Sequence, residues 1–186
     1  MIYIDEPAEN FAGTAQTKAI IFVDNVIYKK QGGITMSISE ANSRLINEYL
    51  DVAVNDSENT DRFMELLSDD CVWSLMPPGI SISGAENLRK FVHFAMGSRK
   101  HNAKSRVEIR NWFTDGEKFC VEYFHGAVVT GIKVVETVCL VCDMRDGKFT
   151  KVNEYVDTSG SKLVAFGLKI FPRVAKRKGI RYAKTL

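Results

Sequence analysis

The stretch DGEKFCVEYFHGAVVTG, residues 115–131, decides the fold because it is a long strand bounded by two turn signals. Asp115-Gly116 is among the strongest short signals for a β-hairpin, and Thr130-Gly131 marks a second reversal of the chain. A third reversal follows at Asp146-Gly147. Residues 105–157 therefore predict four consecutive antiparallel strands, joined by short turns into a curved sheet.

One histidine and one carboxylate lie on the face of this sheet that we expect to be inside. Side chains alternate across a strand, and the odd residues of 119–127 and the even residues of 150–156 are the more apolar sets. Tyr123 and His125 belong to the first set, and Glu154 belongs to the second. We expect His125 and Glu154 to lie two strands apart, about 10 Å between backbones, with a water or small substrate between them. Such a pair suits general acid/base chemistry.

The same residues have a plainer interpretation. A half-buried histidine on a strand is more often a packed, hydrogen-bonded side chain than a catalyst, and a glutamate near a strand end is often only solvated. Two hypotheses follow. Either the pair is catalytic, or the same side chains satisfy one another in a non-catalytic ligand-binding or dimerisation module.

Three helices and a short strand are predicted upstream of the sheet. Residues 39–55 have apolar side chains at helical spacing and predict a long amphipathic helix. A short helix is predicted over residues 61–67, and a strand over 71–76 that ends at two prolines. The capping-box spacing at residues 83–86 begins a third helix, which should end near Gly97.

These features together resemble a known superfamily. The run LSDDCVW at residues 67–73, the helix start Gly84-Ala85-Glu86 and the segment NEYVD at residues 153–157 are similar to the nuclear transport factor 2-like superfamily. Within it, the SnoaL-like polyketide cyclases and the limonene-epoxide hydrolases are the most similar. The resemblance covers about residues 38–157. It implies an α+β fold in which a cone-shaped, curved antiparallel sheet wraps around a long N-terminal helix with two shorter helices.

The resemblance also implies a deep apolar pocket and the residues that line it. The epoxide hydrolases carry Arg-x-Asp on the middle strand and an Asp on the last strand, where this chain has Tyr123, His125 and Glu154. Because the arginine and one carboxylate are missing, proton transfer of the cyclase kind is the closer analogy. His125 is expected to act as general base or acid, Glu154 to orient it or position water, and Tyr123 to donate to an oxyanion. The expected substrate-binding residues are Tyr49, Trp73, Leu75, Phe91, Val138 and Leu140.

The expected function is therefore that of a cofactor-free enzyme, a cyclase, isomerase, dehydratase or hydrolase, acting on a small apolar organic molecule. The sequence has no glycine loop for phosphate and no metal-ligand spacing. Cys139 and Cys142 are three residues apart on a strand, so they should face opposite sides and share no metal. We expect neither a metal nor a cofactor.

A homodimer is expected through the outer face of the sheet. The side chains that point outward from two neighbouring strands are too apolar to be left exposed to solvent on a monomer. The resemblance also implies dimers that pack sheet against sheet. These outward residues are Cys120, Glu122, Phe124, Val135, Thr137, Cys139 and Val141.

Length and composition indicate one domain between two tails. The chain has 186 residues, of which 45% are hydrophobic, enough for a sizeable core over residues 38–157. No apolar run is long enough to span a membrane, and no basic region precedes an apolar run at the amino terminus, so we expect a soluble, cytoplasmic protein. Residues 1–37 are expected to be an extension. The codons for Gln31-Gly32-Gly33 can encode a ribosome-binding sequence, which makes Met36 a candidate for the true start.

The C-terminal tail, residues 158–186, is basic. It holds eight Lys and Arg and no acidic residue, which leaves 25 − 8 = 17 basic against 23 acidic side chains in the rest of the chain. Because Gly167, Pro172 and Gly179 interrupt any long helix, we expect a partly ordered tail that is solvated from Lys176 onward. Contact of this tail with nucleic acid or a membrane is a weaker alternative.

Overall fold

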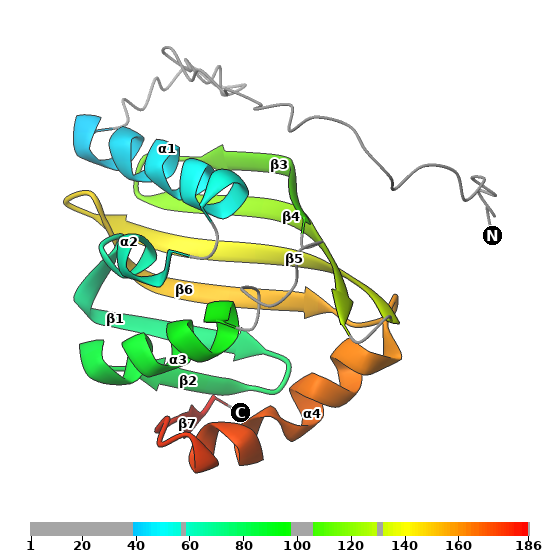
Figure 1. Cartoon of the computed structure of the whole chain (residues 1–186). Helices are drawn as coiled ribbons and strands as arrows, with labels where there is room; N and C mark the ends of the chain where they lie inside the picture. The colour runs from blue at the N-terminus through cyan, green and yellow to red at the C-terminus, as the bar shows by residue number, and fades with distance from the viewer. Residues whose placement is uncertain (1–38, 57–58, 98–105, 130–131, 186) are drawn as a thin grey trace, which may run out of the picture.

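The computed structural model describes residues 39–56, 59–97, 106–129 and 132–185 of the chain. Its elements are, in chain order, α1 (Glu40–Asn55), α2 (Thr60–Met64), β1 (Leu67–Met76), β2 (Ile80–Ser83), α3 (Ala85–Gly97), β3 (Arg106–Thr114), β4 (Lys118–Val129), β5 (Ile132–Arg145), β6 (Lys148–Asp157), α4 (Lys162–Arg177) and β7 (Ala183–Lys184). The strands form one curved sheet in the order β3-β4-β5-β6-β1-β2-β7. Helices α1, α2 and α3 lie over one face of this sheet (Figure 1). The predicted α+β fold is confirmed, and the expected N-terminal extension and start at Met36 lie outside the described residues.

The four-strand meander predicted for residues 105–157 is present as β3 to β6. Its longest pairing joins β4 and β5 without interruption, from Lys118 opposite Asp143 to Val129 opposite Ile132. The turn between β5 and β6 is made by Asp146 and Gly147, with φ of 52° and 73°. A two-residue hairpin turn requires this left-handed conformation, which is why the Asp-Gly signal was informative.

A buried asparagine of α1 connects two of the hairpin turns. The Asn42 side-chain amide donates to the Gly116 carbonyl at 2.7 Å, and the Gly147 backbone N–H donates to Asn42 Oδ1 at 3.1 Å. Ser39 caps the same helix by accepting from the Asn42 backbone N–H. The start of α1 is thereby fixed against the turns of both the β3–β4 and β5–β6 hairpins.

Strand β1 departs from the simple antiparallel pattern. It runs parallel to β6, with Trp73 opposite Val152 and Leu75 opposite Glu154, and antiparallel to β2. A parallel pair needs a long crossover connection, and here α3 and the meander supply it. The sheet is therefore mixed. This pairing brings β1 and the last strand of the meander side by side, which the sequence analysis did not foresee.

The C-terminal segment is more ordered than the sequence predicted. α4 continues through Gly167 and Pro172, because its apolar side is packed: Phe171 is 8% exposed and Ala175 is 0% exposed. The helix ends just before Gly179, after which Ile180 is again buried and β7 pairs with β2. Lys176 to Lys178 are exposed, as expected, but the expectation that the whole tail beyond them is solvated does not hold at Ile180, which is 2% exposed.

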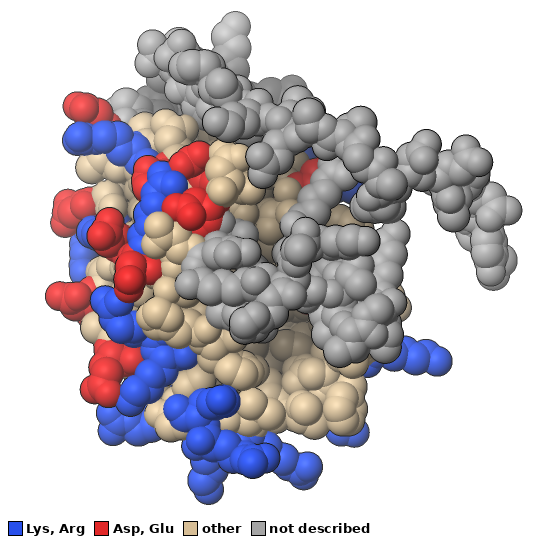
Figure 2. All heavy atoms as spheres, viewed as in Figure 1, with Lys and Arg blue, Asp and Glu red and all other residues tan. Residues whose placement is uncertain are grey.

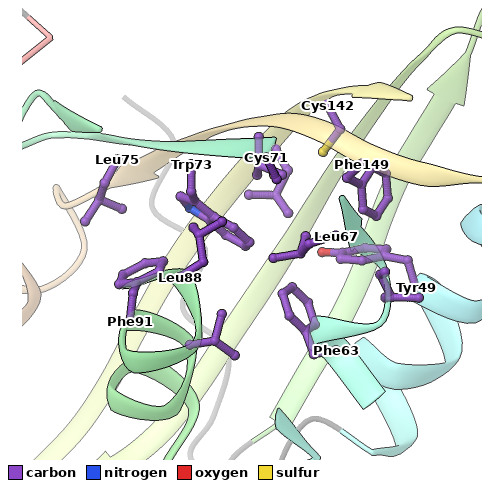
Figure 3. Close-up of a cluster of buried hydrophobic side chains, with 14 of the residues drawn as sticks. Tyr49, Phe63, Leu67, Cys71, Trp73, Leu75, Leu88, Phe91, Cys142 and Phe149 are labelled. Carbon is purple, nitrogen blue, oxygen red and sulfur yellow. The ribbon is translucent and has the colours of Figure 1, made fainter. Parts of the chain in front are cut away.

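The hydrophobic core fills the space between the three N-terminal helices and the inner face of the sheet. Figure 3 shows Tyr49 of α1 close to Phe149 of the sheet and to Phe63 of α2, while Trp73 lies beside Leu88 and Phe91. Tyr49 packs edge-on against Phe149, with ring centroids 5.7 Å apart. A rigid aromatic core of this kind forms the base on which the site is built.

Candidate functional site

An inner cavity lies between α1, α2, α3 and the sheet. It measures about 70 Å³. Among the described residues, its walls are apolar and aromatic apart from a carboxylate, an indole N–H and two phenols. The described lining residues are Tyr49, Ala53, Phe63, Trp73, Phe91, Val92, Ala95, Val107, Tyr123, Leu140 and Glu154.

The carboxylate of Glu154 is held by the indole of Trp73. Trp73 Nε1 donates to Glu154 Oε2 at 2.8 Å, between neighbouring strands β1 and β6. Trp73 is 6% exposed, so the donor approaches from the core side. A hydrogen bond to an ionised oxygen is stronger than one between neutral groups, and it fixes the direction of the carboxylate.

The indole is itself held between two phenylalanines. The Phe63 and Trp73 ring centroids are 5.8 Å apart with planes at 45°, and the Trp73 and Phe91 centroids are 5.6 Å apart at 65°. Tyr49 continues this chain, with its ring 6.3 Å from that of Phe63. Tilted and edge-on pairs are the arrangements that aromatic quadrupoles prefer, so the lining rings stabilise one another.

His125 and Glu154 face the same side of the sheet, but the expected separation is wrong. His125 lies opposite Glu136 of β5, whereas Glu154 lies opposite Leu140 of β5. The two residues are therefore two strands apart and also four residues apart along the strands, on the order of 15 Å between backbones. A single water cannot bridge them. Parity along a strand gives the face of a side chain, but it does not give the register between strands.

His125 has a different acidic neighbour, which the sequence analysis missed. His125 Nδ1 lies 2.7 Å from Glu136 Oε1, and the two side chains are 11% and 20% exposed. The sequence could have shown this pairing. Because Val129 pairs with Ile132, counting back along β4 and forward along β5 places residue 136 opposite residue 125. His125 is not among the described residues that line the inner cavity.

Of the nine residues expected at the site, six line the cavity: Tyr49, Trp73, Phe91, Tyr123, Leu140 and Glu154. Leu75 and Val138 are buried, 4% and 2% exposed, but they belong to the surrounding core. Phe63, within the helix predicted over residues 61–67, was not expected at the site, yet it lines the cavity because α2 folds over β1. The packing of a short helix on a distant strand leaves no local signal.

The cysteines are distributed as side-chain alternation predicts. Cys142 faces the core and is 1% exposed, whereas Cys139 lies on the outer face and is half-buried. Burial raises the pKa of the Cys71 thiol to about 12. On the same outer face, Cys120 Sγ lies 3.7 Å from Cys139 Sγ, because the two residues are diagonal neighbours on β4 and β5. Burial also raises the pKa of Cys120 to about 11.

The outer face of the sheet carries a second, shallower hollow of about 530 Å³. Two of its aromatic side chains are well exposed, Phe113 at 57% and Tyr155 at 46%. The described residues that line it are Met76, Asn111, Phe113, Cys120, Glu122, Thr137, Cys139, Tyr155, Val156 and Asp157.

Basic side chains gather at the end of the molecule where α4 and β7 lie, while acidic ones are concentrated near α1 and α2 (Figure 2). α4 itself has no acidic residue in its first turn, and Lys176 and Arg177 lie in its last. In the part of the chain that the structure covers, no helix is long and apolar enough to cross a membrane.

Comparison with known families matches residues 46–152 to the SnoaL-like domain. The chain belongs to the SnoaL-like family. This assignment agrees with the resemblance on which the expected cone fold was based. No curated protein matches the SnoaL-like chain.

Solved structures of the same fold include enzymes and ligand complexes. An epoxide hydrolase like the limonene-epoxide enzymes, from M. tuberculosis, is 20% identical over 74% of this chain and 95% of its own, with a TM-score of 0.52. A putative SnoaL-like polyketide cyclase from Jannaschia is 12% identical over 71% and 95% of the two chains, also with a TM-score of 0.52. A ketosteroid isomerase-like protein from Catenulispora acidiphila, solved with trimethylamine, is 13% identical over 67% and 90%, with a TM-score of 0.51. At these identities the likeness shows the fold alone.

Proposed function

We propose that this SnoaL-like protein binds a small, largely apolar organic molecule in the inner cavity and moves a proton on it without a cofactor. One observation carries the proposal: the carboxylate of Glu154 is oriented by the Trp73 indole at 2.8 Å in a cavity whose other described lining residues are apolar or aromatic. A positioned carboxylate at the wall of a water-poor pocket is the group that general base catalysis requires.

The roles divide among three lining residues. On a carbonyl substrate, the proton of an adjacent C–H bond passes to Glu154, the electron pair of that bond forms a C=C double bond, and the π pair of the C=O bond moves to the oxygen. Tyr123 lines the same cavity and would donate its phenolic O–H to the developing oxyanion. Trp73 keeps the carboxylate directed into the cavity. The product is an enolate, the common first intermediate of isomerisation, cyclisation and dehydration.

Solved structures of the same fold include a putative SnoaL-like polyketide cyclase and an epoxide hydrolase like the limonene-epoxide enzymes, so the fold is compatible with an enzyme. The expected role of His125 as the base is not carried into the proposal, because that residue pairs with Glu136 and is not among the residues known to line the cavity.

A screen for carbon-acid exchange tests the proposal without a known substrate. A panel of small ketones and diketones is incubated with the protein in D2O, and loss of the α-proton signals is followed by NMR. We expect catalysed exchange of at least one compound, and a rate about 100-fold lower for Glu154→Gln, the usual scale for a lost acid or base. Glu122→Gln, on the outer face, is the matched control and should leave the rate unchanged. Equal rates in wild type and Glu154→Gln would contradict the proposal.

A second candidate is a non-catalytic ligand-binding module of the same fold. The small size of the inner cavity favours it, because about 70 Å³ lies well below the roughly 300–1,000 Å³ of pockets for drug-sized ligands. Binding of a compound in the cavity without any proton exchange would select this candidate.

We also propose that the chain forms a homodimer through the outer face. The support is the hollow of about 530 Å³ on that face, with Phe113 and Tyr155 exposed beside Cys120, Thr137 and Cys139. Large aromatic groups exposed around a hollow are typical of a protein interface rather than of a free surface.

A further inference from the structure

We propose that the outward face of α4 binds the surface of an anionic phospholipid membrane. The inference goes beyond the proposed function and does not depend on it, because no residue of α4 is among the described residues that line the inner cavity. Three observations support it: the way α4 is fixed to the domain, the side chains on its outward face, and the charge of the segment that contains it.

One side of α4 is fixed to the domain by aromatic packing and by the chain that follows the helix. Phe171 packs against Phe91 and Phe94 of α3, with ring centroids 5.9 Å and 5.7 Å apart. Beyond the helix, the Arg181 backbone N–H donates to Asn87 Oδ1 at 2.7 Å, and β7 pairs with β2. These contacts hold α4 in one orientation, so a particular face of the helix is turned to the outside.

The outward face combines basic side chains with exposed apolar ones. Residues three, four and seven apart share a face of a helix, and four exposed residues follow this spacing: Lys162, Phe166, Lys169 and Arg173. Phe166, which is 58% exposed, lies among the three cations, and Leu163 in the same turn is 40% exposed. Apolar side chains surrounded by Lys and Arg are typical of helices that lie in the plane of a membrane interface.

The segment has the charge that an anionic surface attracts. Residues 158–186 hold eight Lys and Arg, all of them exposed, and no acidic residue. Among the ion pairs of the described residues, none involves a basic side chain of α4. Figure 2 shows these cations together at one end of the molecule, while the acidic side chains lie near α1 and α2. Each Lys or Arg that reaches an anionic bilayer adds to the attraction, so a face of several cations binds more strongly than one.

The exposed apolar side chains favour a membrane over a nucleic acid. The phosphates of DNA or RNA attract the same cations, but they offer Leu163 and Phe166 no comparable apolar layer. At a bilayer, the cations meet the lipid phosphates while both apolar side chains enter the boundary between head groups and acyl chains. A membrane therefore contacts the whole face, whereas a nucleic acid uses mainly its charge.

Sedimentation of the full chain with lipid vesicles tests the proposal. Phosphatidylcholine vesicles that contain about 30% phosphatidylserine should bind the protein at least about 10-fold more strongly than pure phosphatidylcholine vesicles. Raising the salt concentration from about 0.1 M to about 0.5 M should release it, because the range of the electrostatic attraction shortens.

Charge-reversal variants assign the binding to α4. Lys169→Glu combined with Arg173→Glu should lower binding to the anionic vesicles by about 10-fold or more. Lys118→Glu combined with Arg145→Glu is the matched control, because it makes the same change of net charge at side chains that are 61% and 63% exposed near the hairpin turns. These turns lie at the opposite end of β6 from α4, so the control should lower binding by less than about 3-fold.

The aromatic side chain is tested separately at constant charge. Phe166→Ala should lower binding to the anionic vesicles by about 5-fold or more, whereas Phe166→Trp should retain it. The new indole should also shift its fluorescence to shorter wavelength when anionic vesicles are added, as it enters a less polar layer. Because Phe166 is exposed, both variants should keep the wild-type midpoint of urea denaturation.

Four results would overturn the proposal. The first is an absence of binding to the anionic vesicles at about 0.05 M salt, where the attraction is strongest. The second is an equal loss of binding in the two charge-reversal pairs, which would show an effect of net charge alone. The third is vesicle binding by Phe166→Ala equal to that of wild type. The fourth is tighter binding of a single-stranded or duplex oligonucleotide than of vesicles, which would assign the face to nucleic acid. The exchange screen contains no lipid, so its result is independent of all four.

Discussion

Trp73 donates its indole N–H to Glu154 across 81 positions of the sequence, and this bond joins the parallel strands β1 and β6 at the wall of the inner cavity. Trp73→Phe keeps an aromatic ring between Phe63 and Phe91 but removes the donor. The carboxylate then loses a partner at a half-buried position, so the free energy of unfolding should fall by about 1–3 kcal/mol. Urea denaturation measures the change. In a double-mutant cycle with Glu154→Gln, the losses from Trp73→Phe and Glu154→Gln should not be additive. Additive losses would contradict a direct interaction between the two side chains.

The pair of His125 and Glu136 is predicted to stabilise the fold rather than to act on the ligand. His125→Ala leaves the Glu136 carboxylate without its neighbour at 2.7 Å, so the free energy of unfolding should fall by about 1–3 kcal/mol. A double-mutant cycle with Glu136→Gln should show that the two effects are not additive. Ligand binding in the inner cavity should be unchanged. A rate loss of about 100-fold at unchanged stability would instead restore His125 as the catalytic base.

Arg62 of α2 connects to three carboxylates around α1 and should make stability depend on pH in acid. Its guanidinium lies 2.6 Å from both Glu48 and Asp51 and 3.4 Å from Asp56. Hydrogen bonds from Asn55 and Arg62 lower the pKa of Asp51 below its usual value of 3.8. A lowered pKa in the folded state means that the stabilisation is present above the usual value and is lost as pH falls through the lowered one.

Comparing wild type with Arg62→Met by urea denaturation between about pH 6 and about pH 2 tests this assignment. Because the Asp51 side chain is 45% exposed, solvent screening should keep the difference at neutral pH to about 1 kcal/mol or less. The difference should shrink toward zero in the acid range. A difference that is constant with pH would show that Arg62 contributes through packing alone.

Thiol reactivity should report the burial of the cysteines. The pKa of Cys71 is raised to about 12 and that of Cys120 to about 11, so at pH 8 both are almost entirely in the unreactive thiol form. Cys142 is buried as well, and burial raises its pKa. Iodoacetamide should therefore modify Cys71 and Cys142 in the native protein far more slowly than in urea, as mass spectrometry of the peptides will show. Equal rates in both states would contradict the placement of these residues.

The proposed dimer depends on the exposed aromatic residues of the outer face. Phe113→Glu places a charge beside the hollow and should shift the molecular mass in solution from dimer to monomer, since a desolvated charge opposes association. Phe166→Glu is a matched control, because Phe166 on α4 is 58% exposed against 57% for Phe113. Light scattering at micromolar concentration gives the masses. A monomeric wild type would refute the proposal.

Local signals in the sequence were sufficient for most of the fold. The Asp-Gly turns and the alternation of apolar residues gave the meander, and helical spacing with capping residues gave α1 and α3. What they did not give was contact between distant segments. The parallel pairing of β1 with β6, the hydrogen bonds of Asn42 to two turns and the packing of α4 through Pro172 all depend on tertiary contacts that leave no local pattern.

The candidate site shows the same division. Alternation placed Tyr123, His125 and Glu154 on one face, and the β4–β5 and β5–β6 pairings have that parity. Alternation does not give the register between strands, so the predicted neighbours of His125 and Glu154 were wrong. His125 contacts Glu136, and Glu154 accepts a hydrogen bond from Trp73. Counting residues from the turn between β4 and β5 would have identified Glu136 as the neighbour of His125. The contact of Glu154 with Trp73 depends on the crossover that brings β1 beside β6, which only the folded chain shows.

The most direct test of the central claim is to follow the two tryptophan indole N–H signals by NMR while small ketones of the exchange panel are added. The chain has two tryptophans, and Trp73→Phe assigns their signals by removing one. If small organic molecules bind in the inner cavity, the Trp73 signal should shift and saturate with ligand, while the Trp112 signal, outside the cavity lining, should stay in place. A shift of Trp112 alone, or of neither indole at saturating ligand, would contradict the claim that this cavity is the binding site.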